Sequence, residues 1–198
     1  MQRVFSDIMK ERERKYGDMI TKAENPGKAK FSYKKYYPIR KLICSSFAEK
    51  FHCDMMIQDV AQMMMLGDTQ PAYVCSVDPL CVMAYSDELD AVVKLRFPTE
   101  LAAKYDLKVG SRLVTSCVYM PNHFDTVAGD ITAGEHNTGR YSNFIPIVQL
   151  FLAKKDDEIR ARTALFGEDV WNRVETLGKC CMDRDPDRCR DGFSYFKK

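Results

Sequence analysis

The stretch AYVCSVDPLCVMAYSDELDAVVKLRF, residues 72–97, decides the fold of this chain. Apolar and β-branched residues alternate through it with a period of two, which is typical of strands. We predict strands at 72–77, 80–85 and 90–97, with SDELD as the connection of a hairpin. A fourth run, RLVTSCVYM at 112–120, has the same period. Residues 72–120 therefore predict a small, mostly antiparallel sheet or partial barrel.

Helical periodicity flanks this sheet on both sides. Before it, apolar residues at steps of three and four predict a central helix over about 38–66, with Pro38 in its first turn and Gly67 as its stop. After it, a C-terminal helix is predicted over about 155–177 and is ended by Gly178. The stripe that we assign to the core of the central helix contains Ile39, Leu42, Ile43, Phe47 and Phe51.

These elements together predict a single α+β domain, in which the sheet packs against the two helices. We expect the domain to span 1–178, with a further helix over 3–22 lying at its periphery. Residues 179–198 are rich in Asp, Arg and Cys, and we expect a polar tail there. The spacing of Cys180, Cys181 and Cys189 is not that of a zinc site, and their role stays open.

One segment resembles a known structural unit. VVKLRFPTELAAKYDLKVGSRLV, residues 92–114, is similar to the strand–proline–helix–strand unit of AbrB-type swapped-hairpin transcription factors, which dimerise on DNA. The matching positions are Phe97, Pro98, Leu101, Tyr105, Leu107, Lys108, Val109, Gly110 and Leu113. Because the similarity covers about 23 of 198 residues, we use it only for local structure: a strand, a short helix and a strand.

The composition is that of a globular protein, with 45% apolar and 29% charged residues. The longest apolar run, FIPIVQLFLA at 144–153, is far shorter than the ~20 residues of a membrane-spanning helix. The charged start MQRVFSDIMKERERKYGD lacks the apolar core of a signal peptide. We therefore expect a cytoplasmic, reducing location, no membrane contact, and eight cysteines that stay free.

Positive charge concentrates in the first 50 residues, which hold 13 Lys/Arg and 6 Asp/Glu. Within them lies KAKFSYKKYYPIRK, residues 28–41, where cations alternate with rings as in proteins that hold a nucleic-acid strand. Because the central helix follows directly, we expect most of these rings to be buried and the charges to form one exposed patch. The predicted partner-binding residues are Lys28, Lys30, Lys34, Lys35, Arg40 and Lys41.

The long irregular segment 121–143 is the alternative candidate site. It carries side chains suited to acid–base catalysis or metal ligation: His123, Asp125, Asp130, Glu135, His136 and Arg140. Their spacing matches no metal-binding or catalytic signature, and the chain contains no phosphate-binding glycine loop. We therefore predict no metal site and no cofactor. Convergence of His123 and His136 on a carboxylate would favour an enzyme.

The first hypothesis for function is a non-enzymatic intracellular interaction protein, a component of a larger assembly. It would contact an acidic partner through its basic N-terminal third. A protein partner comes before nucleic acid, because the isoelectric point of about 8.1 lies below the value of ~9 typical of nucleic-acid binders. The second hypothesis is a small hydrolase-type enzyme, with or without a metal ion, whose site is segment 121–143. The oligomeric state stays open.

Overall fold

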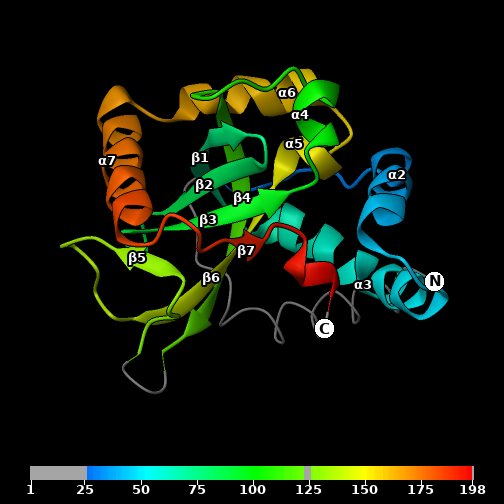
Figure 1. Ribbon diagram of the computed structural model, residues 1–198, viewed down its shortest axis with the longest axis horizontal. Coiled ribbons are helices and arrows are strands. Elements are labelled where there is room, and N and C mark those ends of the chain that lie inside the picture. Colours follow the sequence, from blue (N-terminus) through cyan, green and yellow to red (C-terminus); the bar gives the residue numbers. More distant parts are fainter. Residues whose placement is uncertain (1–25, 123–125, 198) are drawn as a thin grey trace, which may run out of the picture.

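The computed structural model describes residues 26–122 and 126–197, so the helix predicted over 3–22 lies outside the described residues. Helices surround a curled sheet (Figure 1). The strands are β1 (Asp68–Val77), β2 (Leu80–Ser86), β3 (Ala91–Phe97), β4 (Arg112–Pro121), β5 (Ile131–Ala133), β6 (Tyr141–Val148) and β7 (Arg190–Asp191). The helices are α2 (Tyr33–Ile43), α3 (Phe47–Leu66), α4 (Glu100–Lys104), α5 (Gln149–Leu152), α6 (Asp156–Ala161), η1 (Arg162–Leu165), α7 (Glu168–Arg184) and η2 (Ser194–Phe196).

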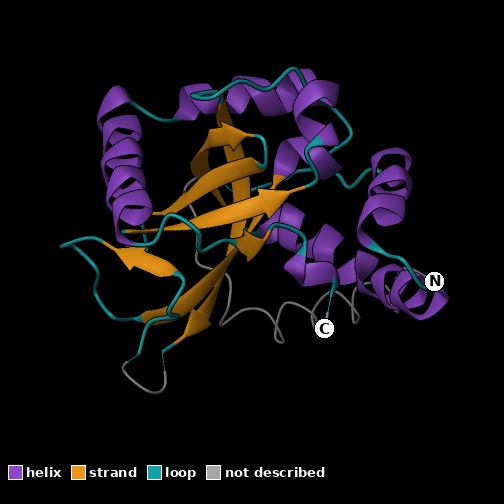
Figure 2. Cartoon of the chain, viewed as in Figure 1, coloured by secondary structure: helices purple, strands orange, loops and turns teal. Residues whose placement is uncertain are grey.

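The sheet has the order β5-β3-β2-β1-β4-β6, with antiparallel pairing throughout this path. The short β7 adds to β3 in parallel. The sheet curls into a half-barrel (Figure 2), which confirms the predicted α+β class and the antiparallel partial barrel. The strand, short helix and strand expected over 92–114 are β3, α4 and β4.

Two apolar layers hold the sheet. On one face, alternate residues such as Val82 and Leu95 join the main core with α2, α3, α4, α5 and α6. On the opposite face, Met83, Tyr85 and Val92 pack against Val174, Leu177 and Cys181 of α7. The alternation follows from the period of two in a strand, which places neighbouring side chains on opposite faces.

The predicted central helix over 38–66 is two helices, α2 and α3, separated at 44–46. Pro38 lies inside α2, which begins five residues earlier than expected. At the start of α3, Ser46 and Glu49 form a capping box in which each side chain bonds the other residue's backbone N–H. The apolar stripe does not continue across this break. Leu42, Phe47 and Phe51, which we placed in the core, are 46%, 84% and 58% exposed.

The predicted helix over 155–177 is also divided, into α6, η1 and α7, and α7 continues past Gly178 to Arg184. Gly178 is therefore not a helix stop. A Cβ atom at this position would lie 2.2 Å from Tyr73 Oη. Glycine at this position thus allows α7 to approach β1 closely.

No helix among the described residues is long and apolar enough to cross a membrane.

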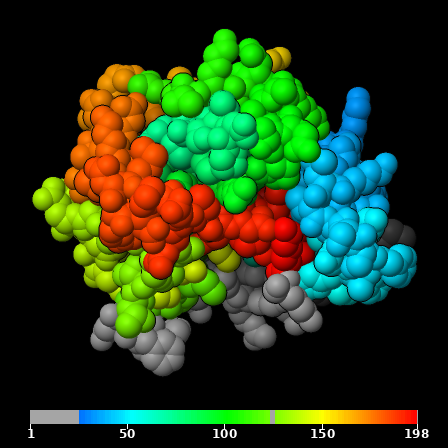
Figure 3. Space-filling model, viewed as in Figure 1, coloured from blue at the N-terminus to red at the C-terminus, as the bar shows by residue number. Residues whose placement is uncertain are grey.

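Segment 179–198, expected as a polar tail, contributes to the core. Phe193, Tyr195 and Phe196 are buried, and Gly192 N donates to Arg96 O beside the β3–β7 pairing. Figure 3 shows the segment crossing the surface between α7 and α3. Three aromatic side chains outweigh the polar composition of this segment, because burying each ring stabilises the fold by about 1.5–3 kcal/mol.

Candidate anion-binding site

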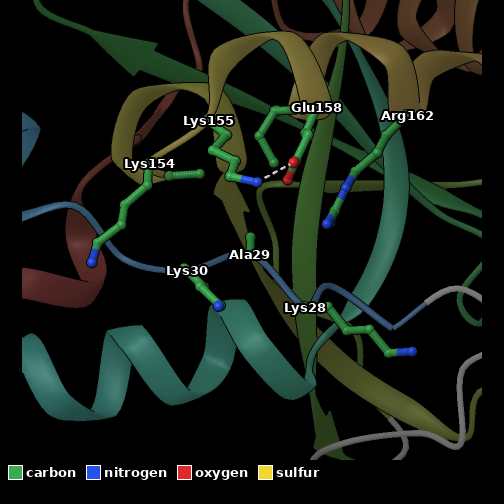
Figure 4. A pocket seen from close by; sticks show the side chains of 9 residues that line it. Lys28, Ala29, Lys30, Lys154, Lys155, Glu158 and Arg162 are labelled. Carbon is green, nitrogen blue, oxygen red and sulfur yellow. Dashed lines mark hydrogen bonds and ion pairs between the residues drawn. The ribbon is translucent and has the colours of Figure 1, made fainter.

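A small basic hollow lies where the segment before α2 meets the segment around α6. Its volume is about 150 Å³, and Ala29, Ala153 and Ile159 form its apolar wall. Figure 4 shows its charged side chains, which come from two parts of the chain more than 120 residues apart. We call it the basic pocket; its charged residues are Lys28, Lys30, Lys154, Lys155, Glu158 and Arg162.

Backbone hydrogen bonds place the two lysines of the N-terminal segment. On one side, Lys28 N donates to Met65 O (2.9 Å) and Ala29 N to Met64 O (3.1 Å), at the end of α3. On the other side, Lys154 N donates to Lys30 O (2.9 Å). The segment is therefore held between α3 and the chain that enters α6, so that Lys28 and Lys30 line the same hollow as Lys154. The ammonium groups of Lys28 and Lys154 extend from it in opposite directions (Figure 4).

Two features of the backbone show how tightly this segment is held. A Cβ atom at Gly27 would lie 2.3 Å from Met64 O, so only glycine fits at this approach. Lys28 has a φ of +42°, in the left-handed region that favours glycine or asparagine. Holding a lysine in this conformation lowers the stability of the fold by roughly 1–3 kcal/mol, and the surrounding contacts must offset this loss.

Arg162 forms the inner wall of the pocket. Its Nη1 donates to Gly27 O and, at 2.9 Å, to Gln149 Oε1. The buried Gln149 amide in turn donates to Thr115 O (3.1 Å) and Ser116 Oγ (3.0 Å). Burial lowers the pKa of Arg162 from its ordinary value, although a guanidinium remains charged. The sheet thus fixes one cation at the base of the pocket.

The charges of the basic pocket do not balance. Lys155 pairs with Glu158, the one carboxylate among the lining residues. Within the described part of the chain, no carboxylate pairs with the ammonium groups of Lys28, Lys30 or Lys154. Cations gathered in this way repel one another and attract an anion.

The six predicted partner-binding residues do not form one patch. Lys28 and Lys30 line the basic pocket, and Lys34 and Lys41 are exposed on α2. Lys35 and Arg40 are engaged within the molecule. Lys35 Nζ lies 2.6 Å from Leu150 O and 2.5 Å from Asp156 Oδ1, and burial lowers its pKa. Arg40 pairs with Asp54.

The rings of segment 28–41 divide equally between core and surface. Phe31 and Tyr36 are buried, whereas Tyr33 and Tyr37 are 52% and 46% exposed. The exposed pair lies with ring centroids 6.3 Å apart and planes tilted by 35°. Among the residues that the structure describes, no ring lines the basic pocket itself.

The candidate residues of segment 121–143 point in different directions. His123 and Asp125 lie outside the described residues. Asp130 accepts two hydrogen bonds of 2.7 Å from Arg190, which lower its pKa. Glu135 and His136 are exposed, and Arg140 stacks on Tyr141. Across residues 26–122 and 126–197, no group of three or more His, Cys, Asp or Glu is arranged to hold a metal ion.

Sequence reasoning missed Asp90, the most connected carboxylate of the structure. Arg173 Nε and Nη2 donate to its two oxygens at 3.0 and 2.5 Å, and Tyr85 Oη and His136 N donate as well. Asp90 therefore fastens α7 and segment 134–137 to the β2–β3 turn. Its positive φ of +41° is favourable for Asp, and the turn sequence SDELD was the available signal.

No protein-family model, curated protein or solved structure matches this chain. The function therefore has to be inferred from the arrangement of its own residues. Of the two candidate sites, the basic pocket is the one in which charges gather without partners.

Proposed function

We propose that this protein is a non-enzymatic interaction protein whose basic pocket binds an anionic group of an acidic partner. The unbalanced charge carries the proposal: among the described residues, four lysines and Arg162 line a hollow with one carboxylate, which Lys155 already pairs. A cationic site of this kind concentrates anions and steers a charged partner toward it. Membership of a larger assembly and a cytoplasmic location belong to the same proposal.

The partner that we propose is an acidic protein segment. The hollow of about 150 Å³ accommodates one carboxylate or phosphate group, and none of the described residues that line it is aromatic. Single-stranded nucleic acids are bound by stacking their bases on rings beside a basic groove. Because the pocket has no such ring, we place nucleic acid second.

The hydrolase hypothesis has weaker support. Asp130 is neutralised by Arg190, and His136 is 74% exposed and 3.5 Å from a similarly exposed Glu135. A general base needs an orienting partner. His136 borders a cavity of about 350 Å³ with Asp87 and Asp90, but within the described residues only the exposed Glu135 lies near its imidazole. We therefore do not propose it as a second function.

The experiment compares two variants that remove the same charge. Lys30→Ala/Lys154→Ala removes two cations from the pocket, and Lys34→Ala/Lys41→Ala removes two exposed cations from α2. Binding of a fluorescein-labelled oligoglutamate peptide is measured by anisotropy at low and high salt. We expect the pocket variant to bind roughly five- to tenfold more weakly at low salt, since each exposed ion pair contributes up to ~1 kcal/mol. The difference should shrink at high salt.

Equal losses in the two variants would show that only overall charge matters and would contradict the pocket. A single-stranded oligonucleotide serves as the second probe. Tighter binding of the oligonucleotide, weakened more by Tyr33→Ala/Tyr37→Ala than by the pocket variant, would replace the acidic-protein proposal with nucleic-acid binding.

A further inference from the structure

Two buried cysteines face each other at the junction of α2 and α3. Cys44 is the C-cap of α2, and Cys53 lies in the second turn of α3. Their Sγ atoms are 2.8 Å apart, although all eight cysteines of the chain are free. A disulfide bond is about 2.05 Å long, so closing it requires a movement of less than about 1 Å.

The local structure holds the two thiols in this position. Ser45 N and Ser46 N donate to Glu49 Oε2 at 2.6 and 3.1 Å, which fixes the connection between the helices. Asp54, next to Cys53, accepts from Tyr36 Oη at 2.8 Å and pairs with Arg40 on α2. Both helices are therefore tied together on either side of the thiol pair.

The pair also lines a cavity, unlike a cysteine packed wholly inside the core. A cavity of about 470 Å³ is bounded by Cys44, Cys53, Glu49, His52 and Lys197, of which Glu49 and Lys197 are exposed. This volume lies in the range of small-molecule sites, roughly 300–1,000 Å³. A small reagent therefore has room to reach the sulfur atoms.

We propose that Cys44 and Cys53 are a redox-active dithiol, which closes to an intramolecular disulfide by exchange with a small disulfide of the oxidised-glutathione class. The thiolate of one cysteine attacks a sulfur of the small disulfide, forms a mixed disulfide and releases one thiol. The second thiolate then attacks the protein sulfur of the mixed disulfide and releases the other. The two protons of the cysteine thiols end on the two released thiols, so the pair is oxidised and the small disulfide is reduced.

Burial and the hydrogen bond with Cys44 raise the pKa of the Cys53 thiol to about 12, while the Lys197 ammonium acts in the opposite direction. The thiolate fraction at neutral pH is therefore small, and we expect closure to be slow there. Proximity compensates in the second step, because the mixed disulfide forms beside the remaining thiol.

The test incubates the reduced, folded chain with oxidised glutathione, then quenches with acid and alkylates the remaining thiols in denaturant. Trypsin cleaves after Lys41 and Lys50, and an Asp-specific endoprotease cleaves before Asp54. We expect the intact mass, taken after the acid quench and before alkylation, to fall by about 2 Da, the mass of the two hydrogens lost. After alkylation and digestion, peptide 42–50 should be found joined to peptide 51–53. Cys44→Ser and Cys53→Ser should each abolish this product, and Cys180→Ser, which removes an exposed thiol, should retain it.

An unchanged mass, a stable glutathione adduct at Cys44 or Cys53 without closure, or a disulfide that joins other cysteines would each overturn the proposal. The wild-type peptide map decides the question even if a serine variant fails to fold.

Discussion

Asp90 and Asp130 each meet a guanidinium in two hydrogen bonds, whereas Lys28, Lys30 and Lys154 gather around a hollow without a carboxylate of their own. In the first region, charges join distant elements: Arg173 ties α7 to the β2–β3 turn, and Arg190 ties the C-terminal segment to residues before β5. In the second region, the backbone alone brings the charges together. The difference separates charges that hold the fold from charges that remain available to a partner.

Arg173→Ala tests the first region and should have the largest effect on stability. It leaves the Asp90 carboxylate, which is 5% exposed, without its cation, and breaking such a pair costs about 3 kcal/mol or more. Urea unfolding measures the loss. The matched control is Arg112→Ala, whose partner Glu168 is 72% exposed; we expect this variant to lose less than ~1 kcal/mol. Equal losses would remove the distinction between the two kinds of pair.

Gly27→Ala tests the backbone of the second region. The added methyl would lie 2.3 Å from Met64 O, a backbone atom that cannot move without displacing α3. We expect a loss of about 2 kcal/mol, in the range for overpacking, and weaker binding of the oligoglutamate peptide. Gly129→Ala is a control, because its φ is not in the left-handed region and a Cβ there would make only an ordinary contact, 3.6 Å from Arg188 Nη1. If Gly27→Ala bound the peptide normally, the close approach of Gly27 to Met64 O would not be needed to place Lys28 and Lys30.

Asp68 is a buried carboxylate that pairs with no cation in the described part of the chain, and it can be tested through the pH dependence of stability. Burial raises its pKa to about 6, so its stabilising contribution is complete below the unfolded pKa of ~4 and is lost as pH rises through 6. From pH 5 to 7.5, wild type should lose about 1.5 kcal/mol relative to Asp68→Asn. Unfolding by urea at both pH values measures this difference. Parallel pH dependences in the two proteins would exclude Asp68 as the titrating group.

Lys28→Gly should have the smallest effect, in the opposite direction. Glycine relieves the left-handed φ of +42°, and we expect a gain of about 0.5–1 kcal/mol together with weaker peptide binding. Such a result would show that the fold loses stability by having a lysine at position 28, and that this lysine contributes to peptide binding. Thermal unfolding and anisotropy measure the two effects; a destabilised variant that binds normally would assign Lys28 to the fold.

Much of the fold could be predicted, because strand periodicity is local. The alternation over 72–97 placed β1, β2 and β3, and the same pattern placed β4. The break between α2 and α3 at residues 44–46 also had a signal in the sequence, because Ser46 and Glu49 have the spacing of a capping box. The run of apolar residues across it concealed the break. Gly178 looked like a helix stop because its contact with Tyr73 depends on tertiary packing.

Only the N-terminal side of the candidate site could be predicted. Lys28 and Lys30 lie in a visibly basic stretch, but Lys154, Lys155 and Arg162 come from a separate part of the sequence and have no motif of their own. Lys35 and Arg40 looked equivalent to their neighbours, and only the fold shows that Asp156 and Asp54 engage them. Charge in a sequence does not reveal which charges are paired in space.

Amide hydrogen exchange with and without the oligoglutamate peptide tests the central claim most directly. The basic pocket predicts new protection in residues 27–30 and 153–162, which lie on opposite sides of the hollow. The same experiment on Lys30→Ala/Lys154→Ala should show little or none of it. Protection confined to α2 or to residues 126–143, or no protection where the peptide binds, would contradict the assignment of the basic pocket as the binding site.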